Sequence, residues 1–315
     1  MHHDIIPASS GPLLLIHGGA GNVGRAADPG PQRDAFYAGL MASLQAGATV
    51  LAAGGDALAA ALAAVAELED NPCFNAGYGG VCCADGSVEL SACVMEGKRR
   101  RCGAVAGLRR CPRPAALAAG LLDHHHVLLY GSSAEDLAPG LGLPLVSPTS
   151  LVSPRRREQW LELSRQGAAP ALDHDGTATV GAVARDASGH LVAITSTGGL
   201  AGQLPGRIGD SPIPGHGTWA DDRCCAISTT GKGEAFMACA SARHLHDRMS
   251  LGVETAPIAA AACLEEVTEV GGEGGCLVLA ASGESCLSFS SPHMLRGVWQ
   301  IASGPLAAIG REALG

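Results

Sequence analysis

Hydrophobic residues follow two patterns along this chain: helical spacing, and short compact apolar runs. Helical spacing is typical of helices with one buried face, and apolar runs bounded by glycine, proline or aspartate are typical of buried strands. The first pattern predicts helices at about 36–53, 57–69, 114–122, 153–166 and 234–249, and one more that begins after Thr255. The second predicts strands at 13–16, 87–95, 103–107, 127–130, 179–184, 191–196, 224–229, 277–280 and 286–289.

The order of these elements favours a layered α/β architecture. The runs at 179–184 and 191–196 flank a turn sequence, Asp-Ala-Ser-Gly, and predict a hairpin. The runs at 277–280 and 286–289 predict a second hairpin. Helices come between pairs of strands and not in strict alternation with single strands. This order predicts two packed β-sheets with helical layers outside them.

Two segments rich in small residues interrupt the predicted elements. Residues 17–21, His-Gly-Gly-Ala-Gly, follow the first strand, and their glycines predict a tight turn beneath an active site. The spacing fits neither the Walker pattern nor GxGxxG, which argues against a phosphate-binding loop. Residues 167–178 are rich in alanine, glycine, proline and aspartate, and they predict a mobile linker that is open to cleavage.

Composition narrows the class of protein. A chain of 315 residues with 47% hydrophobic residues can bury a sizeable core, and 44 glycines indicate close packing. The net charge of −9, without clustered basic stripes, argues against a nucleic-acid partner. No apolar run approaches the roughly 20 residues of a membrane span, and the N-terminus lacks a signal-peptide pattern. We therefore expect a cytoplasmic protein with no membrane partner.

Cysteine and histidine give little sign of metal or disulfide chemistry. The 12 cysteines include no CxxC pair, so we expect them to be reduced and mostly buried. The run His124-His125-His126 precedes a short apolar strand. Three consecutive imidazoles cannot share one face of a strand, which argues against a metal site there.

Thr179 stands at an abrupt junction between a polar, glycine-containing run and the apolar run that follows it. Such a threonine has two interpretations. It is the first residue of an ordinary strand, or it becomes a new N-terminus when the chain cuts itself between Ala178 and Thr179. A threonine with a free α-amine is a nucleophile that carries its own base.

Other polar residues near strand ends share this ambiguity. Thr197 and Thr230 each precede glycine at the end of a predicted strand, where they form either ordinary turn hydroxyls or the floor of an active site. Arg207 and Asp210 lie three apart in a loop stiffened by glycine and proline. They form either a surface salt bridge or a clamp, in which the arginine binds an α-carboxylate and the aspartate accepts from an α-ammonium.

Together these residues resemble the plant-type L-asparaginase and isoaspartyl aminopeptidase family of N-terminal nucleophile hydrolases. Six motifs in the family's order, which span nearly the whole chain, carry the resemblance: 16–21 (IHGGAG), 68–79 (LEDNPCFNAGYG), 179–184 (TVGAVA), 195–199 (TSTGG), 205–212 (PGRIGDSP) and 229–234 (TTGKGE). The resemblance implies a four-layer αββα sandwich formed by residues 1–315 as a single domain. It also implies autocleavage into subunits 1–178 and 179–315, and a dimer of such heterodimers.

The resemblance implies a role for each residue. Thr179 would attack the side-chain amide of L-asparagine or of a β-aspartyl dipeptide, and its α-amine would be the general base. Thr197 would orient the nucleophile, and the Thr230 hydroxyl with the Gly231 amide would form the oxyanion hole. The substrate-binding residues would be Arg207, Asp210, Asn75 and Gly231. No organic cofactor is implied, but a structural sodium ion would bind the backbone carbonyls of Leu68, Glu69, Asn71, Phe74, Ala76 and Tyr78.

The chain departs from the family pattern at three places. Ala178 replaces the usual glycine before the nucleophile, Ser91 stands where the family generally has aspartate, and 200–203 lacks a frequent lysine. Two other functions therefore stay open. One is a glycosylasparaginase-like amidase, a branch of the superfamily that residues 209–215 also resemble. The other is an uncleaved, inactive homologue that binds aspartyl compounds.

Overall fold

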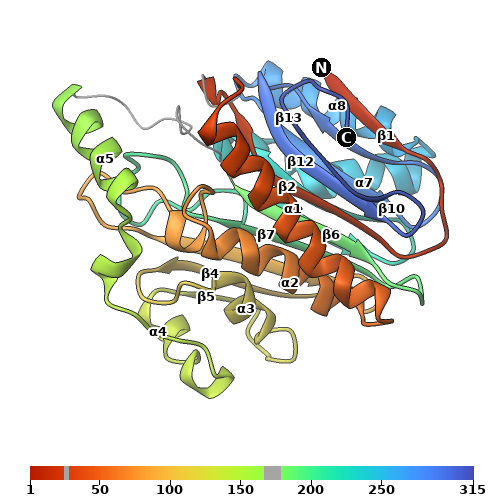
Figure 1. Cartoon of the computed structure of the whole chain (residues 1–315). Helices are drawn as coiled ribbons and strands as arrows, with labels where there is room; N and C mark the ends of the chain where they lie inside the picture. The colour runs from red at the N-terminus through yellow and green to blue at the C-terminus, as the bar shows by residue number, and fades with distance from the viewer. Residues whose placement is uncertain (25–27, 167–178) are drawn as a thin grey trace.

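Two stacked β-sheets with helices on both outer faces form the molecule (Figure 1). The computed structural model describes residues 1–24, 28–166 and 179–315. In spatial order, the larger sheet contains β13 (Gly304–Ile309), β12 (His293–Gln300), β2 (Leu13–Gly21), β6 (Val180–Arg185), β7 (Leu191–Thr197), β3 (Leu90–Glu96), β4 (Arg101–Leu108) and β5 (Leu128–Tyr130). The smaller sheet contains β1 (His2–Ile6), β11 (Ser285–Phe289), β10 (Gly274–Ala280), β9 (Cys225–Gly231) and β8 (Thr218–Asp221).

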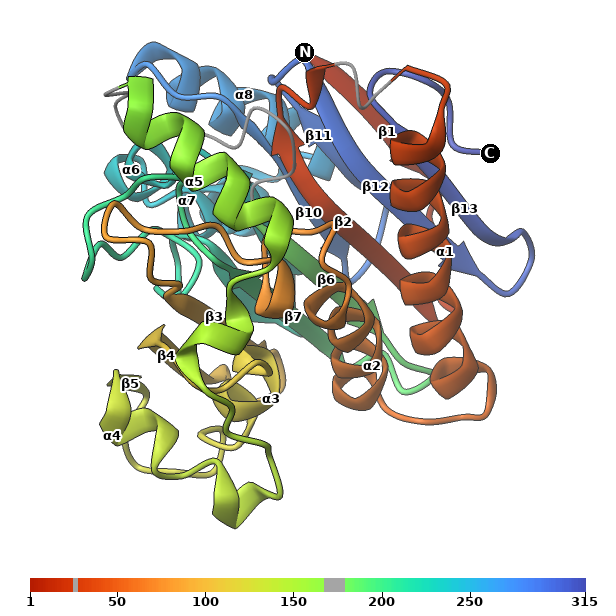
Figure 2. The ribbon, with the colours of Figure 1, turned by 60° about the vertical axis from the view of Figure 1, so that its left-hand side comes forward.

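Helices cover the two sheets from opposite sides. Figure 2 shows α1 and α2 in front of the larger sheet, whereas α7 and α8 lie behind the smaller one. The α-helices are α1 (Pro31–Ala52), α2 (Ala57–Asp70), α3 (Pro114–Ala119), α4 (Ser132–Glu135), α5 (Pro154–Gln166), α6 (Gly233–Ala238), α7 (Ser241–Gly252) and α8 (Ala256–Glu269). Short 3₁₀ turns are η2 (Gly77–Gly79), η3 (Pro139–Leu141) and η4 (Pro148–Leu151). The αββα sandwich expected from the sequence is thus confirmed.

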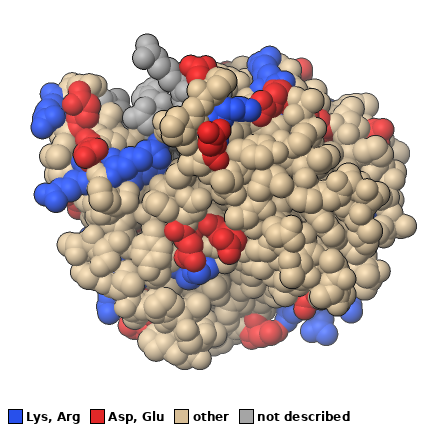
Figure 3. All heavy atoms as spheres, in the orientation of Figure 1, with Lys and Arg blue, Asp and Glu red and all other residues tan. Residues whose placement is uncertain are grey.

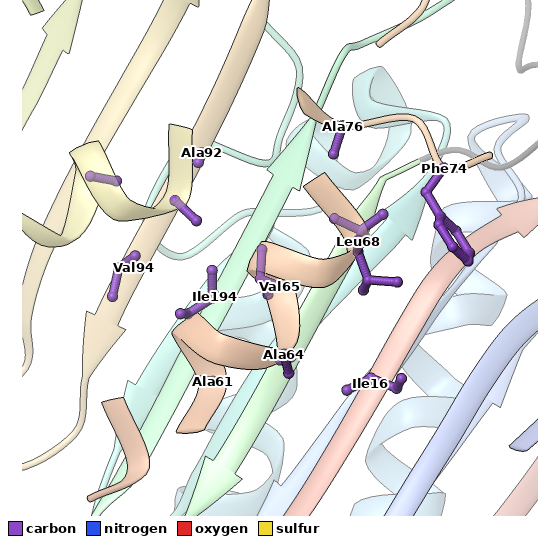
Figure 4. Packing of buried hydrophobic residues seen from close by; sticks show 14 of the residues in the cluster. Ile16, Ala61, Ala64, Val65, Leu68, Phe74, Ala76, Ala92, Val94 and Ile194 are labelled. Carbon is purple, nitrogen blue, oxygen red and sulfur yellow. The ribbon is translucent and has the colours of Figure 1, made fainter. Parts of the chain in front are cut away.

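Alternation along the strands builds separate apolar layers. On β2, Leu14 and Ile16 face α1 and α2, whereas Leu13 and Leu15 face the smaller sheet. Both faces are buried, which explains why the strands read as continuous apolar runs in the sequence. Figure 4 shows the first of these layers, where Val65 and Leu68 of α2 lie over the larger sheet.

By length and composition alone, helix α1 is long and apolar enough to cross a membrane. From the sequence we expected no segment of this kind. Phe36, Leu40 and Leu44 of this helix are fully buried in the layer between the helices and the larger sheet. Both observations fit a core helix of a layered domain. On the face of the molecule in Figure 3, acidic and basic side chains are interspersed and form no basic stripe.

The predicted glycine turn at 17–21 is wrong, because β2 continues through Gly21. His17 pairs with Gly181 on β6, and residues 19–21 pair with β12 across a β-bulge. The glycines are needed for packing. A Cβ on Gly18 would lie 2.5 Å from the ring of Phe74, so only glycine lets that ring cover the strand.

Other differences arise where tertiary contacts override local pattern. The helix predicted at 234–249 is broken at Ala240, which has φ 46°, into α6 and α7. Strands β1, β8, β12 and β13 were not predicted from the sequence. The predicted hairpins, β6–β7 and β10–β11, are confirmed. Asp56 caps α2, and its side chain accepts from the Ala59 amide. The predicted linker 167–178, including Ala178, lies outside the described residues.

Candidate active site

Thr179 directly precedes β6. Its side chain is 5% exposed. The Oγ1 atom donates to Thr197 Oγ1 at 3.1 Å and lies 3.3 Å from Ser211 Oγ. Thr197 Oγ1 also accepts from the Gly199 amide at 2.9 Å. The two predicted threonines therefore meet, and Ser211 joins them from the loop that precedes β8.

The backbone carbonyl of Thr179 is held as firmly as its side chain. It accepts from Thr230 Oγ1 at 3.3 Å and from His17 Nδ1 at 3.0 Å. Thr230, at the end of β9, also accepts from the Ala20 amide at 3.1 Å. Hydroxyls from both sheets thus converge on one residue.

Gly231 follows Thr230 in a conformation that requires glycine. Its φ is 146°, and a Cβ there would lie 2.3 Å from the Glu273 carbonyl oxygen. Asn75 bonds to the backbone of the neighbouring corner: its Nδ2 donates to the Gly199 carbonyl at 2.8 Å, and its Oδ1 accepts from the Val81 amide at 3.0 Å. Asn75 therefore supports the turn that carries Thr197.

Arg207 and Asp210 do not form the salt bridge that was one interpretation of their spacing; each bonds elsewhere. Arg207 makes a two-pronged ion pair with Glu234, in which both N···O distances are 3.0 Å. Asp210 accepts from Thr229 Oγ1 at 2.8 Å. A Cβ on Gly233 would lie 2.8 Å from Asp210 Oδ1 and 2.9 Å from Arg207 Nη2. The two charged groups therefore approach the same point, from which a side chain is absent.

Burial shifts the ionisation of two carboxyl groups near this site. It raises the pKa of Asp210 to about 6, against the opposing effects of the Thr229 hydroxyl and the Arg207 charge. It also raises the pKa of Glu69 to about 7, although the carboxylate accepts from Ser196 Oγ at 2.7 Å and from the Ala115 amide at 3.0 Å. Because Ser196 precedes Thr197, Glu69 ties the end of α2 to the strand that bears this hydroxyl.

The loop predicted to hold sodium packs its carbonyls against glycine. A Cβ on Gly77 would lie 2.2 Å from the Glu69 carbonyl oxygen, and one on Gly79 would lie 1.9 Å from that of Phe74. The carbonyls of Asn71, Phe74 and Ala76 accept backbone hydrogen bonds inside the loop. In the described part of the chain, His, Cys, Asp and Glu side chains form no cluster able to hold a metal. A cation here would therefore depend on carbonyl oxygens, three of which already accept backbone hydrogen bonds.

Several participants were missed from the sequence. Ser211 follows Asp210 directly, but a serine in a glycine- and proline-rich loop carries no local signal. Glu234 reaches Arg207 across 27 residues. His17 was assigned to a turn, although it continues the alternation of Leu13 and Leu15 toward the smaller sheet. A hollow of about 580 Å³ lined by Arg223, Cys224 and Arg243, among others, contains none of the predicted site residues.

Comparison with known proteins identifies the class to which this fold and site belong. Residues 10–305 match the asparaginase family, and the chain therefore belongs to this family of hydrolases. It is 38% identical to the isoaspartyl peptidase of Salmonella typhimurium over 310 residues, which cover 95% of this chain and 99% of that protein. The isoaspartyl peptidase of Escherichia coli is 37% identical, with 95% and 96% covered. The isoaspartyl peptidase/L-asparaginase of Xenopus laevis is 37% identical over 90% of each chain.

Proposed function

We propose that this protein is a threonine hydrolase that releases L-aspartate from β-aspartyl dipeptides and from L-asparagine. It first cuts itself between Ala178 and Thr179. The observation that carries this proposal is the convergence of Thr197, Ser211 and Thr230 on Thr179, beside a charged pair suited to an amino acid. The names of the relatives support the substrate class.

Each catalytic step has a group in the chain to perform it. After the cut, the α-amine of Thr179 takes the proton from its own Oγ1, which attacks the side-chain amide carbon. The Thr230 hydroxyl and the Gly231 N–H stabilise the negative oxygen of the tetrahedral intermediate. The leaving amine departs with the proton, and water then hydrolyses the resulting ester to free aspartate. Thr197 keeps the nucleophile oriented throughout.

The zwitterionic part of the substrate explains the charged residues. Arg207 binds the α-carboxylate, and Asp210 accepts from the α-ammonium. Before the substrate arrives, Glu234 occupies the guanidinium of Arg207, so the carboxylate must share or replace it. Asn75 serves indirectly, because it holds the turn beyond Thr197. The clamp selects for free α-groups, which asparagine and β-aspartyl dipeptides have in common.

The remaining features follow the family pattern. The carbonyls of Leu68, Glu69, Asn71, Phe74, Ala76 and Tyr78 would hold a structural sodium ion, which would stabilise the loop that carries Asn75. Two split chains associate into a dimer of heterodimers. All twelve cysteines are free, which supports a reducing, cytoplasmic compartment.

Denaturing electrophoresis and an aspartate-release assay test the proposal together. We expect two bands, a new N-terminus reading Thr-Val-Gly-Ala, and release of aspartate from a β-aspartyl dipeptide. A single full-length band after prolonged incubation would contradict the hydrolase and favour the inactive homologue. Aspartate released from glycosylated asparagine, but not from the dipeptide, would favour the glycosylasparaginase alternative.

A further inference from the structure

The imidazole of His17 lies directly behind the nucleophile. His17 occupies β2 on the face that turns toward the smaller sheet, and its side chain is fully buried. Its Nδ1 lies 3.0 Å from the Thr179 carbonyl oxygen, and its Nε2 lies 2.8 Å from Ser228 Oγ on β9. The ring therefore spans the gap between the sheets at the level of the active site.

Donor and acceptor roles along this contact are fixed by elementary chemistry. A carbonyl oxygen only accepts, so Nδ1 must carry the proton, and Nε2 must then accept from the Ser228 hydroxyl. Ser228 Oγ in turn lies 2.8 Å from Thr195 Oγ1, to which Thr218 Oγ1 donates at 2.7 Å. Thr195 Oγ1 is also 3.0 Å from the Gly217 carbonyl, so its proton is shared. The result is an imidazole with its proton on Nδ1 and with Nε2 facing the Ser228 hydroxyl.

Two further observations support this state of the ring. Burial is the largest cause that lowers the pKa of His17, to about 3, and the bond to Thr179 opposes it. The neighbouring strand leaves room for the contact only because residue 181 is glycine. A Cβ there would lie 2.5 Å from His17 Nε2 and 2.1 Å from Ser228 Oγ.

We propose that His17 is a positioning residue, whose Nδ1–H fixes the carbonyl of Thr179 and thereby the orientation of the nucleophile. This inference rests on the proposed function. Once the bond to residue 178 is cut, Thr179 is tethered only through its C-terminal side. Its Oγ1 is held by Thr197. Because the single proton of the Thr230 hydroxyl is needed by the oxyanion, rotation of the Thr179 peptide plane is then opposed by the Nδ1–H of His17. Orientation of this kind acts on the chemical step and not on substrate binding.

Two substitutions by amide residues test the roles of the two ring nitrogens of His17 separately. The side-chain nitrogen of Asn is as many bonds from Cα as Nδ1, whereas that of Gln corresponds to Nε2. We expect His17→Asn to keep kcat within about threefold of the wild type. His17→Gln should lose about tenfold or more in kcat with little change in KM. Rates are counted per split chain, so that slow autocleavage does not enter the comparison.

Equal losses in the two variants, or no loss in the Gln variant, would overturn the proposal. A tautomer measurement on the unmutated protein decides the case in which neither variant folds or splits. In ¹⁵N-histidine-labelled protein, His17 should appear with its proton on Nδ1, and a proton on Nε2 would sink the idea. If the wild-type protein releases no aspartate, the proposed function is contradicted. The tautomer of His17 does not depend on that result and still tests the inference.

Discussion

The proposed nucleophile and the proposed substrate clamp are neighbours, but their side chains differ in chemistry. The contacts described around Thr179 come from Thr197, Ser211 and Thr230, with a neutral imidazole beneath its carbonyl. Around the clamp, Arg207, Glu234 and Asp210 are ionisable, and Glu234 is about half exposed. One region is neutral and buried, and the other is charged and reaches the surface.

This difference shows which polar groups can be buried with little loss of stability. Hydroxyls that satisfy one another can be buried with little loss of free energy, so the nucleophile can be oriented away from water. A buried carboxylate is costly, as the raised pKa of Asp210 indicates. The recognition side therefore gives up stability in the free protein for an interaction that only the substrate completes.

The largest effect on activity is expected at Thr179, in the neutral and buried region. Thr179→Ala removes the nucleophile for both self-cleavage and hydrolysis, so the chain should stay full-length and release no measurable aspartate. Electrophoresis and the aspartate assay check this. Thr179→Ser keeps a hydroxyl and is the matched control, which should still split. Aspartate release by the Ala variant would contradict the assignment of the nucleophile.

The next effect concerns the charged side, where activity and stability should move in opposite directions. Asp210→Asn removes the acceptor charge for the α-ammonium, and kcat/KM should fall by about a hundredfold. The same variant should be more stable at pH 8, by on the order of 2–3 kcal/mol, because it no longer buries an ionised carboxylate. Urea unfolding at several pH values measures the second effect.

The sign of the pH dependence follows from the raised pKa. Folded Asp210 binds its proton more tightly than the unfolded chain does, so this group lowers the free energy of unfolding as pH rises from about 4 to about 6. The advantage of Asp210→Asn should therefore vanish near pH 4 and be complete above about pH 6. An equal gain at pH 4 and pH 8 would mean that Asp210 is not the group that titrates. Wild-type kcat/KM should fall as pH drops through about 6.

The smallest effect on activity is expected at Glu234, the half-exposed residue that pairs with Arg207. Glu234→Gln frees the guanidinium of Arg207, but a partly exposed ion pair contributes little. KM for asparagine should fall by no more than about threefold, with kcat unchanged. A large rise in KM would show instead that Glu234 is needed to hold Arg207 in place.

Much of the fold was predictable because local signals agree with the packing. Asp56 caps α2, and the turn after β6 returns the chain as β7, as the residues indicate. Strand β12 was missed because it carries Arg296, a charged residue with a fully buried side chain. Its guanidinium pairs with the Asp4 carboxylate and donates to the carbonyls of Gly310 and Glu312, which no local pattern reveals. Such burial depends on partners that only the folded chain supplies.

The candidate site was likewise predictable only in part. Thr179, Thr197 and Thr230 were identified by their places at strand ends, and the structure brings all three together. Glu234 and Ser228 were missed because their partners come from distant strands and loops. The glycine run was misjudged for a related reason: glycine permits a turn, but it also permits close packing, and only the ring of Phe74 decides which applies.

The order of strands has a consequence for the life of the molecule after a cut at Thr179. Strands β1 and β2 come from the first segment, yet β1 lies against β11, and β2 lies between β12 and β6. The two pieces would therefore be interleaved in both sheets and would stay joined by backbone hydrogen bonds. Unfolding, however, would release two separate polypeptides, and their reunion would be a second-order reaction that depends on concentration. A cut at Thr179 would therefore leave the native sheets intact but would make refolding of the cleaved protein depend on the meeting of two chains.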